Sequence, residues 1–127
     1  MKITAVKILH AGAGPRNFSF VKIETDAGII GWSEYTEAVG NTGTTAAIER
    51  LAALLIGTDP LRVEQSNALM YTRTIPVWSG IAAHARAALI NALLDVKGKA
   101  LGVTVADLFG GRVRDRIPLY WSHCGNA

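Results

Sequence analysis

The chain has 127 residues, of which 50% are hydrophobic and 18% are charged. This balance is typical of a globular domain with its own core and excludes a disordered segment. The net charge of +3 is too small for the broad basic face of a nucleic-acid-binding protein. A single cysteine, Cys124, excludes an internal disulfide, and no apolar run is long enough for a signal peptide or a membrane span. We therefore expect a cytoplasmic protein that binds neither nucleic acid nor membranes.

The first third of the chain is expected to form three antiparallel strands. Residues 3–9 are rich in β-branched side chains, and residues 18–25 alternate between apolar and polar types, as strands with one buried face do. The turn signal at residues 26–28 predicts that residues 29–34 pair back as a hairpin. The resulting meander has one apolar face that another layer must cover.

Two helices are expected next. Thr44 or Thr45 is a suitable N-cap for the first, whose apolar side chains follow helical spacing. Asp59 followed by Pro60 is typical of an N-cap with proline at the first helical position. A second helix is therefore expected to begin there and to run towards Tyr71.

The longest helix is expected over about residues 81–101, where Gly102 ends it. Thr104 and Asp107 resemble a capping box for a short last helix. A glycine-containing, charged connector follows and leads to an apolar, strand-like run over residues 117–121. The sequence thus predicts an α+β fold, in which a three-stranded antiparallel meander precedes a bundle of three to four α-helices.

Four segments carry a resemblance to a known family. The run 85–102 resembles the helix signature of the mandelate racemase/muconate-lactonising family of the enolase superfamily. Residues 108–111 and 113–116 look like the passage from the amino-terminal capping domain of that family to its catalytic barrel. Residues 31–34 are similar to the end of its third strand.

The resemblance divides the chain into a capping domain, residues 1–116, and the first strand of a truncated (β/α) barrel, residues 117–127. It implies an enzyme that removes a proton α to a carboxylate and stabilises the enolate with Mg²⁺. In the family the base and the metal ligands lie on later barrel strands. We therefore expect no catalytic residue, no metal ligand and no activity in this chain alone. Lys97 and Lys99 form a K-x-K pair, but they belong to the helix signature and are interpreted as structural.

The resemblance also implies that two loops of the capping domain close over the barrel and select the substrate. The first loop is expected over residues 10–17, where glycines permit mobility. His10, Arg16 and Asn17 are candidate substrate-binding residues, because they offer donors to an acidic, hydroxylated ligand. The alternative is an ordinary hairpin connection with a solvated arginine.

The second loop is expected over residues 35–43. Tyr35 and Asn41 are candidate substrate-binding residues in it. Tyr35 could stack on or hydrogen-bond to a substrate, and it could equally pack on Trp32.

Three other polar residues lie in or near these segments. Glu34 and Glu37 suggest a carboxylate pair for acid–base work, but two solvated acids at a strand end are the commoner case and the interpretation adopted here. Ser122 matches a serine that lies at the barrel mouth, near the substrate carboxylate, in similar family members. It is therefore a candidate substrate contact.

The first functional hypothesis is the lid and specificity domain of a Mg²⁺-dependent lyase or isomerase. Acid-sugar dehydration is favoured because a polar, glycine-rich first loop suits a hydroxylated substrate; a racemase or cycloisomerase is the alternative within the family. The expected partners are a small-molecule carboxylate, the chain's own barrel and further copies in a homo-oligomer.

Outside the family, the alternatives are a free-standing binding or assembly module and a small ligand carrier. An unpaired apolar strand at residues 117–121 argues against the free-standing module.

Overall fold

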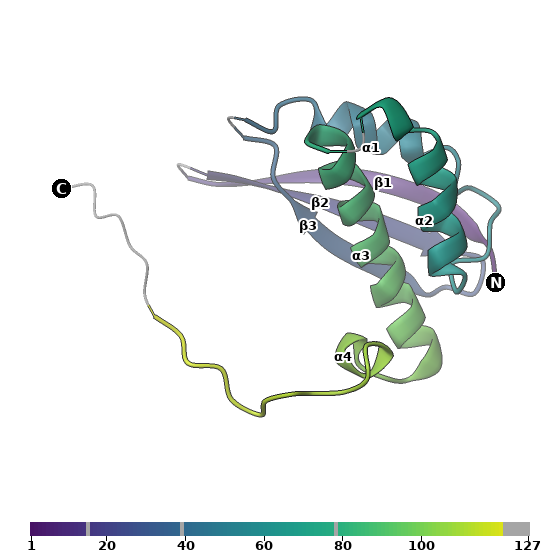
Figure 1. The fold of residues 1–127 in the computed structure, drawn as a ribbon, viewed down its shortest axis with the longest axis vertical. Helices are drawn as coiled ribbons and strands as arrows, with labels where there is room; N and C mark the ends of the chain where they lie inside the picture. Colours follow the sequence, from purple (N-terminus) through teal and green to yellow (C-terminus); the bar gives the residue numbers. More distant parts are fainter. Residues whose placement is uncertain (15, 39, 78, 121–127) are drawn as a thin grey trace.

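The computed structural model describes residues 1–120 with the exception of 15, 39 and 78. Three strands come first and the helices follow them, lying over one face of the sheet (Figure 1). The elements are β1 (Ile3–Ala13), β2 (Arg16–Thr25), β3 (Ile30–Tyr35), α1 (Thr44–Ala52), α2 (Val63–Thr72), the short 3-10 helix η1 (Ile75–Val77), α3 (Ile81–Leu101) and α4 (Val105–Leu108). The predicted α+β architecture is confirmed.

The three strands form an antiparallel meander in the order β1-β2-β3. In β2, Val21 and Ile23 are fully buried beneath the helices. Lys22, which lies between these two residues, and Glu24, which follows them, form an ion pair of 2.7 Å and remain partly exposed. Gly28, with φ of 75°, makes the turn into β3. The alternation of the sequence therefore predicted the buried face of the sheet correctly.

The helix α3 lies directly against the strand β3. A Cβ atom built on Gly31 would lie 2.2 Å from the carbonyl oxygen of Ala92 and 2.5 Å from Cγ2 of Val96. Ser33 lies two residues further along β3, on the same face as Gly31, and its hydroxyl donates to the carbonyl of Ala88 at 2.6 Å. Strand and helix backbones therefore lie directly against each other, with no room for a side chain at position 31.

Side chains of α3 also bond the outer edge of β3. The N–H of Trp32 donates to Oδ2 of Asp95 at 2.8 Å, and Nζ of Lys99 donates to the carbonyl of Ile30 at 2.8 Å. Asp95 and Lys99 are themselves paired at 2.6 Å, one helical turn apart. These backbone groups point away from β2, so the two charged residues complete the edge of the sheet. Lys99 has a structural role.

The second helix begins later than the sequence indicated. It starts at Val63 with Arg62 in the N-cap position, and Asp59-Pro60 lies before it. Oδ1 of Asp59 accepts the N–H of Leu61 at 3.1 Å. This local hydrogen bond makes an Asx-type turn, which competes with helix formation.

The C-terminus of α3 and the N-terminus of α4 follow the prediction. Gly102 adopts a left-handed φ of 67° directly after α3. Before α4, the N–H of Asp107 donates to Oγ1 of Thr104 at 3.2 Å, and the N–H of Thr104 donates to Oδ2 of Asp107 at 2.8 Å. The capping box is therefore complete. None of the helices in the described part of the chain is long and apolar enough to cross a membrane.

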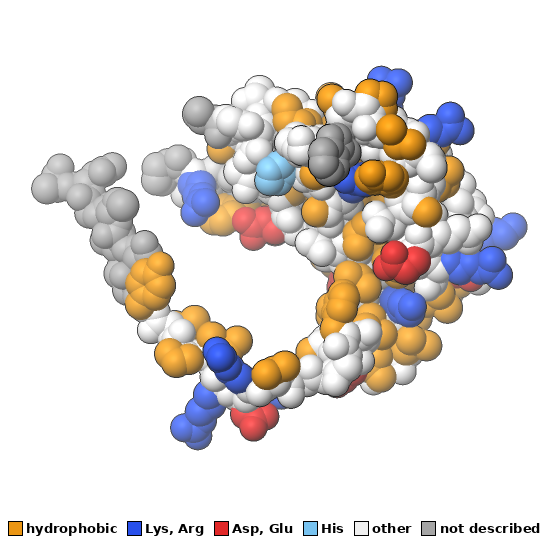
Figure 2. Space-filling view, viewed as in Figure 1, with side chains coloured by type: hydrophobic (Ala, Val, Ile, Leu, Met, Phe, Trp, Pro, Cys, Tyr) orange, Lys and Arg blue, Asp and Glu red, His pale blue; other side chains and the backbone are white. Residues whose placement is uncertain are grey.

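Residues 110–120 leave the body of the domain without helix or strand (Figure 1). Residues 117–120 form no strand within this chain, and their place as the first strand of a barrel stays a prediction. A strand needs a neighbour to complete its backbone hydrogen bonds, and this segment runs away from the sheet. Its apolar side chains gather along the outer arm in Figure 2 and are largely exposed, Leu119 at 91% and Tyr120 at 87%.

Replacing Gly31 tests the contact between β3 and α3. Gly31→Ala is expected to lower the free energy of unfolding by about 1–3 kcal/mol, because the added methyl group overlaps backbone that cannot move independently. Gly12→Ala is the matched control in the same sheet, since a Cβ there meets only Oδ1 of Asn17, at 3.5 Å. Urea unfolding followed by circular dichroism measures both variants. Equal stabilities for the two would contradict the close approach.

Candidate functional site

Three polar side chains lie in one row across the inner face of the sheet. The strand register places His10 opposite Ser19, and Ser19 opposite Tyr35. Nδ1 of His10 lies 3.0 Å from Oγ of Ser19, and the rings of His10 and Tyr35 meet edge to face with centroids 6.4 Å apart. Ser19 and Tyr35 are 3% and 7% exposed, whereas His10 is exposed. The row therefore runs from the interior of the domain to its surface.

The expected first loop is instead the end of a hairpin. β1 continues to Ala13 and β2 begins at Arg16, so that His10, Arg16 and Asn17 all belong to paired strands. The prediction of a loop over residues 10–17 is wrong, because alanine and glycine fit an extended strand as well as a loop. Arg16 and Asn17 are exposed near the hairpin tip, and the Arg16 guanidinium lies 5.5 Å from the centroid of the Phe18 ring.

The second loop is held by the carboxylate of Glu37. Its Oε1 accepts the N–H of Gly43 at 2.6 Å, and its Oε2 accepts the N–H and the hydroxyl of Thr45 at 2.7 and 2.9 Å. Gly43 is the N-cap of α1, where free N–H groups and the helix dipole favour a negative charge. The predicted capping by Thr44 or Thr45 is therefore wrong, and so is the interpretation of Glu37 as a solvated acid.

The protonation states of Glu37 and Tyr35 follow from these contacts. Burial raises the pKa of Glu37, but the hydrogen bonds from Gly43 and Thr45, with the nearby His10, outweigh burial and hold the pKa below its usual value. For Tyr35, burial raises the pKa and the nearby Glu37 carboxylate adds to the rise, against the hydrogen bond with Thr45. At neutral pH Glu37 is therefore an ionised acceptor and Tyr35 a protonated phenol.

Tyr35 joins the polar row to α1. Its hydroxyl lies 2.7 Å from Oγ1 of Thr45. Packing of Tyr35 on Trp32 is excluded, because residues three apart in a strand lie on opposite faces. Trp32 is 43% exposed, with Nζ of Lys22 lying 5.6 Å from its ring centroid.

The structure brings some of the candidate residues together and leaves others apart. His10 and Tyr35 are direct neighbours. Asn41 lies in the second loop, half-buried, and its carbonyl accepts the hydroxyl of Thr44 at 2.7 Å. Ser122 lies outside the described residues.

Among the described residues, no three or more His, Cys, Asp and Glu side chains are grouped so that they could hold a metal ion. The described residues therefore offer no cluster of side chains of the kind that holds Mg²⁺.

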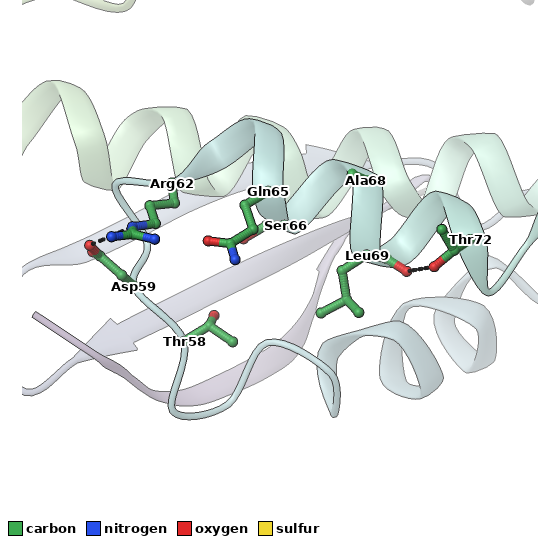
Figure 3. A pocket seen from close by; sticks show the side chains of 8 residues that line it. All are labelled: Thr58, Asp59, Arg62, Gln65, Ser66, Ala68, Leu69 and Thr72. Atoms are coloured by element: carbon green, nitrogen blue, oxygen red, sulfur yellow. Dashed lines mark hydrogen bonds and ion pairs between the residues drawn. The ribbon is translucent and has the colours of Figure 1, made fainter.

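A groove along α2 lies apart from these residues. Its lining consists of Thr58, Asp59, Arg62, Gln65, Ser66, Ala68, Leu69 and Thr72 (Figure 3). Some of its polar groups are already paired: Nε of Arg62 lies 3.9 Å from Oδ2 of Asp59, and the hydroxyl of Thr72 donates to the carbonyl of Leu69 at 2.8 Å. None of the predicted site residues lines this groove.

Comparison with known families decides the identity of the fold. Residues 3–110 match the family described as Mandelate racemase / muconate lactonizing enzyme, N-terminal domain. The chain belongs to this family. The resemblance carried by the helix run 85–102 is thereby confirmed.

Several relatives share this mandelate racemase/muconate lactonizing enzyme N-terminal domain. D-galactonate dehydratases of Xanthomonas campestris pv. campestris (strain B100) and Variovorax paradoxus (strain S110) are each 42% identical over 120 residues, which cover 94% of this chain and 31% of theirs. A solved structure from Burkholderia xenovorans strain LB400, a candidate L-alanine-DL-glutamate epimerase, has a TM-score of 0.94 and 45% identity, covering 98% of this chain and 32% of that one. The same protein has been solved with magnesium and fumarate.

A more distant neighbour is a mandelate racemase/muconate lactonizing protein from Paracoccus denitrificans PD1222, solved with magnesium. Its TM-score is 0.83 at 32% identity, covering 92% of this chain and 32% of that one. The chain thus spans about a third of the length of the relatives that it matches.

Sequence reasoning named the two residues that organise the second loop, Glu37 and Thr45, but gave them other roles, a solvated acid and a helix N-cap. A capping box places the acid three residues after the N-cap, whereas Glu37 precedes Gly43 by six residues, so no local spacing rule marks it. Ser19 was missed, although a signal existed. The Gly-Pro pair at residues 14–15 is a turn signal, and counting back from it pairs His10 with Ser19.

Removing the charge of Glu37 tests its capping role. Glu37→Gln is expected to lower the free energy of unfolding by about 1–2 kcal/mol at neutral pH, because only one of the two acceptor oxygens remains. The folded-state pKa lies below the ordinary value of 4.5, so the contribution is fully present above that pH and is lost as the pH falls through the folded-state pKa. The difference between wild type and variant should therefore shrink below about pH 4.5.

The measurement is urea unfolding of both proteins over the acid to neutral range. Glu34→Gln is the control, since Glu34 is exposed at the end of β3 and its replacement should matter little at any pH. A pH-independent difference for Glu37→Gln, or an equal effect of Glu34→Gln, would contradict capping by the carboxylate.

Proposed function

We propose that this chain is the substrate-selecting domain of a magnesium-dependent acid-sugar dehydratase, located in the cytoplasm and assembled as a homo-oligomer. The observation that carries the proposal is the polar row of His10, Ser19 and Tyr35, which Glu37 ties to the second loop. These contacts bring the β1–β2 hairpin and the second loop, which are distant in sequence, together at one polar end of the domain. Relatives named D-galactonate dehydratase at 42% identity support an acid sugar as the substrate class.

The chemistry explains why such a domain is needed. A proton α to a carboxylate is weakly acidic, and Mg²⁺ bound elsewhere in the enzyme would supply the positive charge that stabilises the enolate. The described residues offer no metal-binding group of this kind. The domain of residues 1–116 is therefore assigned binding, orientation and exclusion of water, and the residues from 117 onward the start of the catalytic barrel.

Each candidate side chain suits part of a hydroxylated acid. The exposed guanidinium of Arg16 offers paired donors to a carboxylate. Asn17, Asn41 and Ser122 offer donors or acceptors to hydroxyl groups. Tyr35 is nearly buried and bonded to Thr45, so it acts through its neighbours more than by direct contact.

A second candidate function is epimerisation of a dipeptide. The 45% identity and TM-score of 0.94 to the candidate L-alanine-DL-glutamate epimerase favour it. Both reactions begin with removal of the proton α to a carboxylate. Dehydration then expels the β-hydroxyl group, whereas epimerisation returns a proton to the opposite face.

Expression of the complete reading frame that encodes this chain tests the proposal. With Mg²⁺ it should convert D-galactonate to a 2-oxo-3-deoxy acid, while the 127-residue chain alone should show no turnover because it lacks a metal-binding group among its described residues. In the active enzyme, Arg16→Met should raise KM by about tenfold through loss of a charged hydrogen bond. Arg50→Met, on exposed α1 surface, is the control. Exchange of the α-proton of L-Ala-L-Glu in D₂O without turnover of any acid sugar would favour the epimerase instead.

A further inference from the structure

The free edge of β1 is bonded only at its beginning. The N–H of Ile3 donates to the carbonyl of Thr58 at 3.0 Å, and the carbonyl of Ile3 accepts the N–H of Gly57 at 2.8 Å. β1 is the outermost strand on its side of the sheet (Figure 1), and within the described residues no other segment bonds the backbone of this edge beyond Ile3. Residues 5–13 therefore present a row of unpaired backbone groups that is longer than an average strand.

An apolar groove lies beside this free edge, on the helix side of the sheet. Val6 and Ile8 pair with fully buried residues of β2, but they are themselves only half-buried. They line a groove of about 270 Å³ together with Glu49, Ala52, Ala53 and Ile56. Side chains that belong to the buried face of the sheet thus remain open at its edge, where a fourth strand would cover them.

A second copy of β1 fits both features. An added strand bonds through its backbone and places alternate side chains in the neighbouring groove, and β1 itself offers Val6 and Ile8 at that spacing. In an antiparallel pair, residues directly opposite each other lie on the same face of the sheet. A two-fold axis between two copies must therefore pass beside a single residue. At Ile8 the axis joins the two grooves into one apolar layer, and Lys7 of each copy lies opposite Leu9 of the other.

The charges along the edge also suit this partner. β1 carries Lys7 and His10 and no acidic residue, whereas the charged side chain among those that line the groove is Glu49. Nζ of Lys7 is already paired with Glu24 at 2.9 Å. Pairing about Ile8 thus places no like charges directly opposite each other and brings a basic strand beside an acidic side chain, which is the complementarity that fixes register.

We propose that β1 pairs with β1 of a second copy, antiparallel about a two-fold axis beside Ile8, and that the two domains form one continuous sheet with three strands from each copy. The ladder spans residues 5–11 of both copies and stops before Ile3, where the edge is already bonded. This inference rests on the homo-oligomer of the proposed function, because it names the surface through which the copies meet.

Cysteine cross-linking in the complete protein tests the position of the axis. Ile8→Cys, made together with Cys124→Ser, should form a disulfide between two copies under mild oxidation, because directly opposite side chains lie within reach of that bond. Ile30→Cys in the same background is the matched control. It also replaces a half-buried isoleucine, on the β3 edge that Asp95 and Lys99 block. Cross-linking of Ile8→Cys is expected to be at least about tenfold faster.

A charge on the axis tests the same contact without oxidation. Ile8→Glu sets two carboxylates directly opposite each other, which destabilises a strand pair. Sedimentation of the complete protein should therefore give about half the wild-type mass for Ile8→Glu, and Ile30→Glu should keep the wild-type mass. Thermal unfolding shows whether each variant retains the fold, and cross-linking alone decides if Ile8→Glu is unfolded.

The outcomes separate this inference from the proposed function. Equal cross-linking of Ile8→Cys and Ile30→Cys overturns the pairing even in an oligomeric protein, because the copies then meet elsewhere or a later segment of the chain covers β1. A monomeric wild-type protein overturns the pairing and the homo-oligomer together, whatever its turnover. The disulfide at residue 8 combined with failure of D-galactonate turnover would sustain the pairing and overturn the dehydratase assignment.

Discussion

The domain depends on the direct contact between β3 and α3 at Gly31. A glycine there lets the strand lie against the helix backbone, at a distance that no other residue permits. Ser33, Asp95 and Lys99 then bond one backbone to the other. Because the strand is fixed at this point, the end of β3 at Tyr35 is fixed as well, and with it the start of the second loop.

A second constraint acts at the other end of β3, where a single charge organises its surroundings. The Glu37 carboxylate satisfies N–H groups at the start of α1 and the hydroxyl of Thr45. Its acceptor-only character sets the direction of the bond from Tyr35 to Thr45. Segments that select ligands are commonly carried on a rigid frame, and here the frame includes the first turn of α1 and the sheet itself.

The sequence predicted what depends on neighbours in the chain and failed on what depends on distant partners. Alternation in residues 18–25 gave the buried face of β2, and Gly102 gave the end of α3, because period and left-handed geometry are local properties. The helix run 85–102 also gave the family. The role of Glu37 escaped prediction because its partners are reached only after a loop closes. Asp59 misled for a related reason: its side chain stabilises a turn as readily as a helix start, and the sequence alone does not say which.

The bonding of Asp95 and Lys99 to Trp32 and Ile30 gives the sheet two unequal edges. An open strand edge is a template for another strand, and proteins commonly block it with charged side chains. Along β3 the blocking side chains come from α3. An incoming strand would first have to break the ion pair between Asp95 and Lys99 and their two hydrogen bonds to the backbone of β3. Lateral growth of the sheet, whether by domain swapping or by aggregation, is therefore directed away from β3 and towards β1.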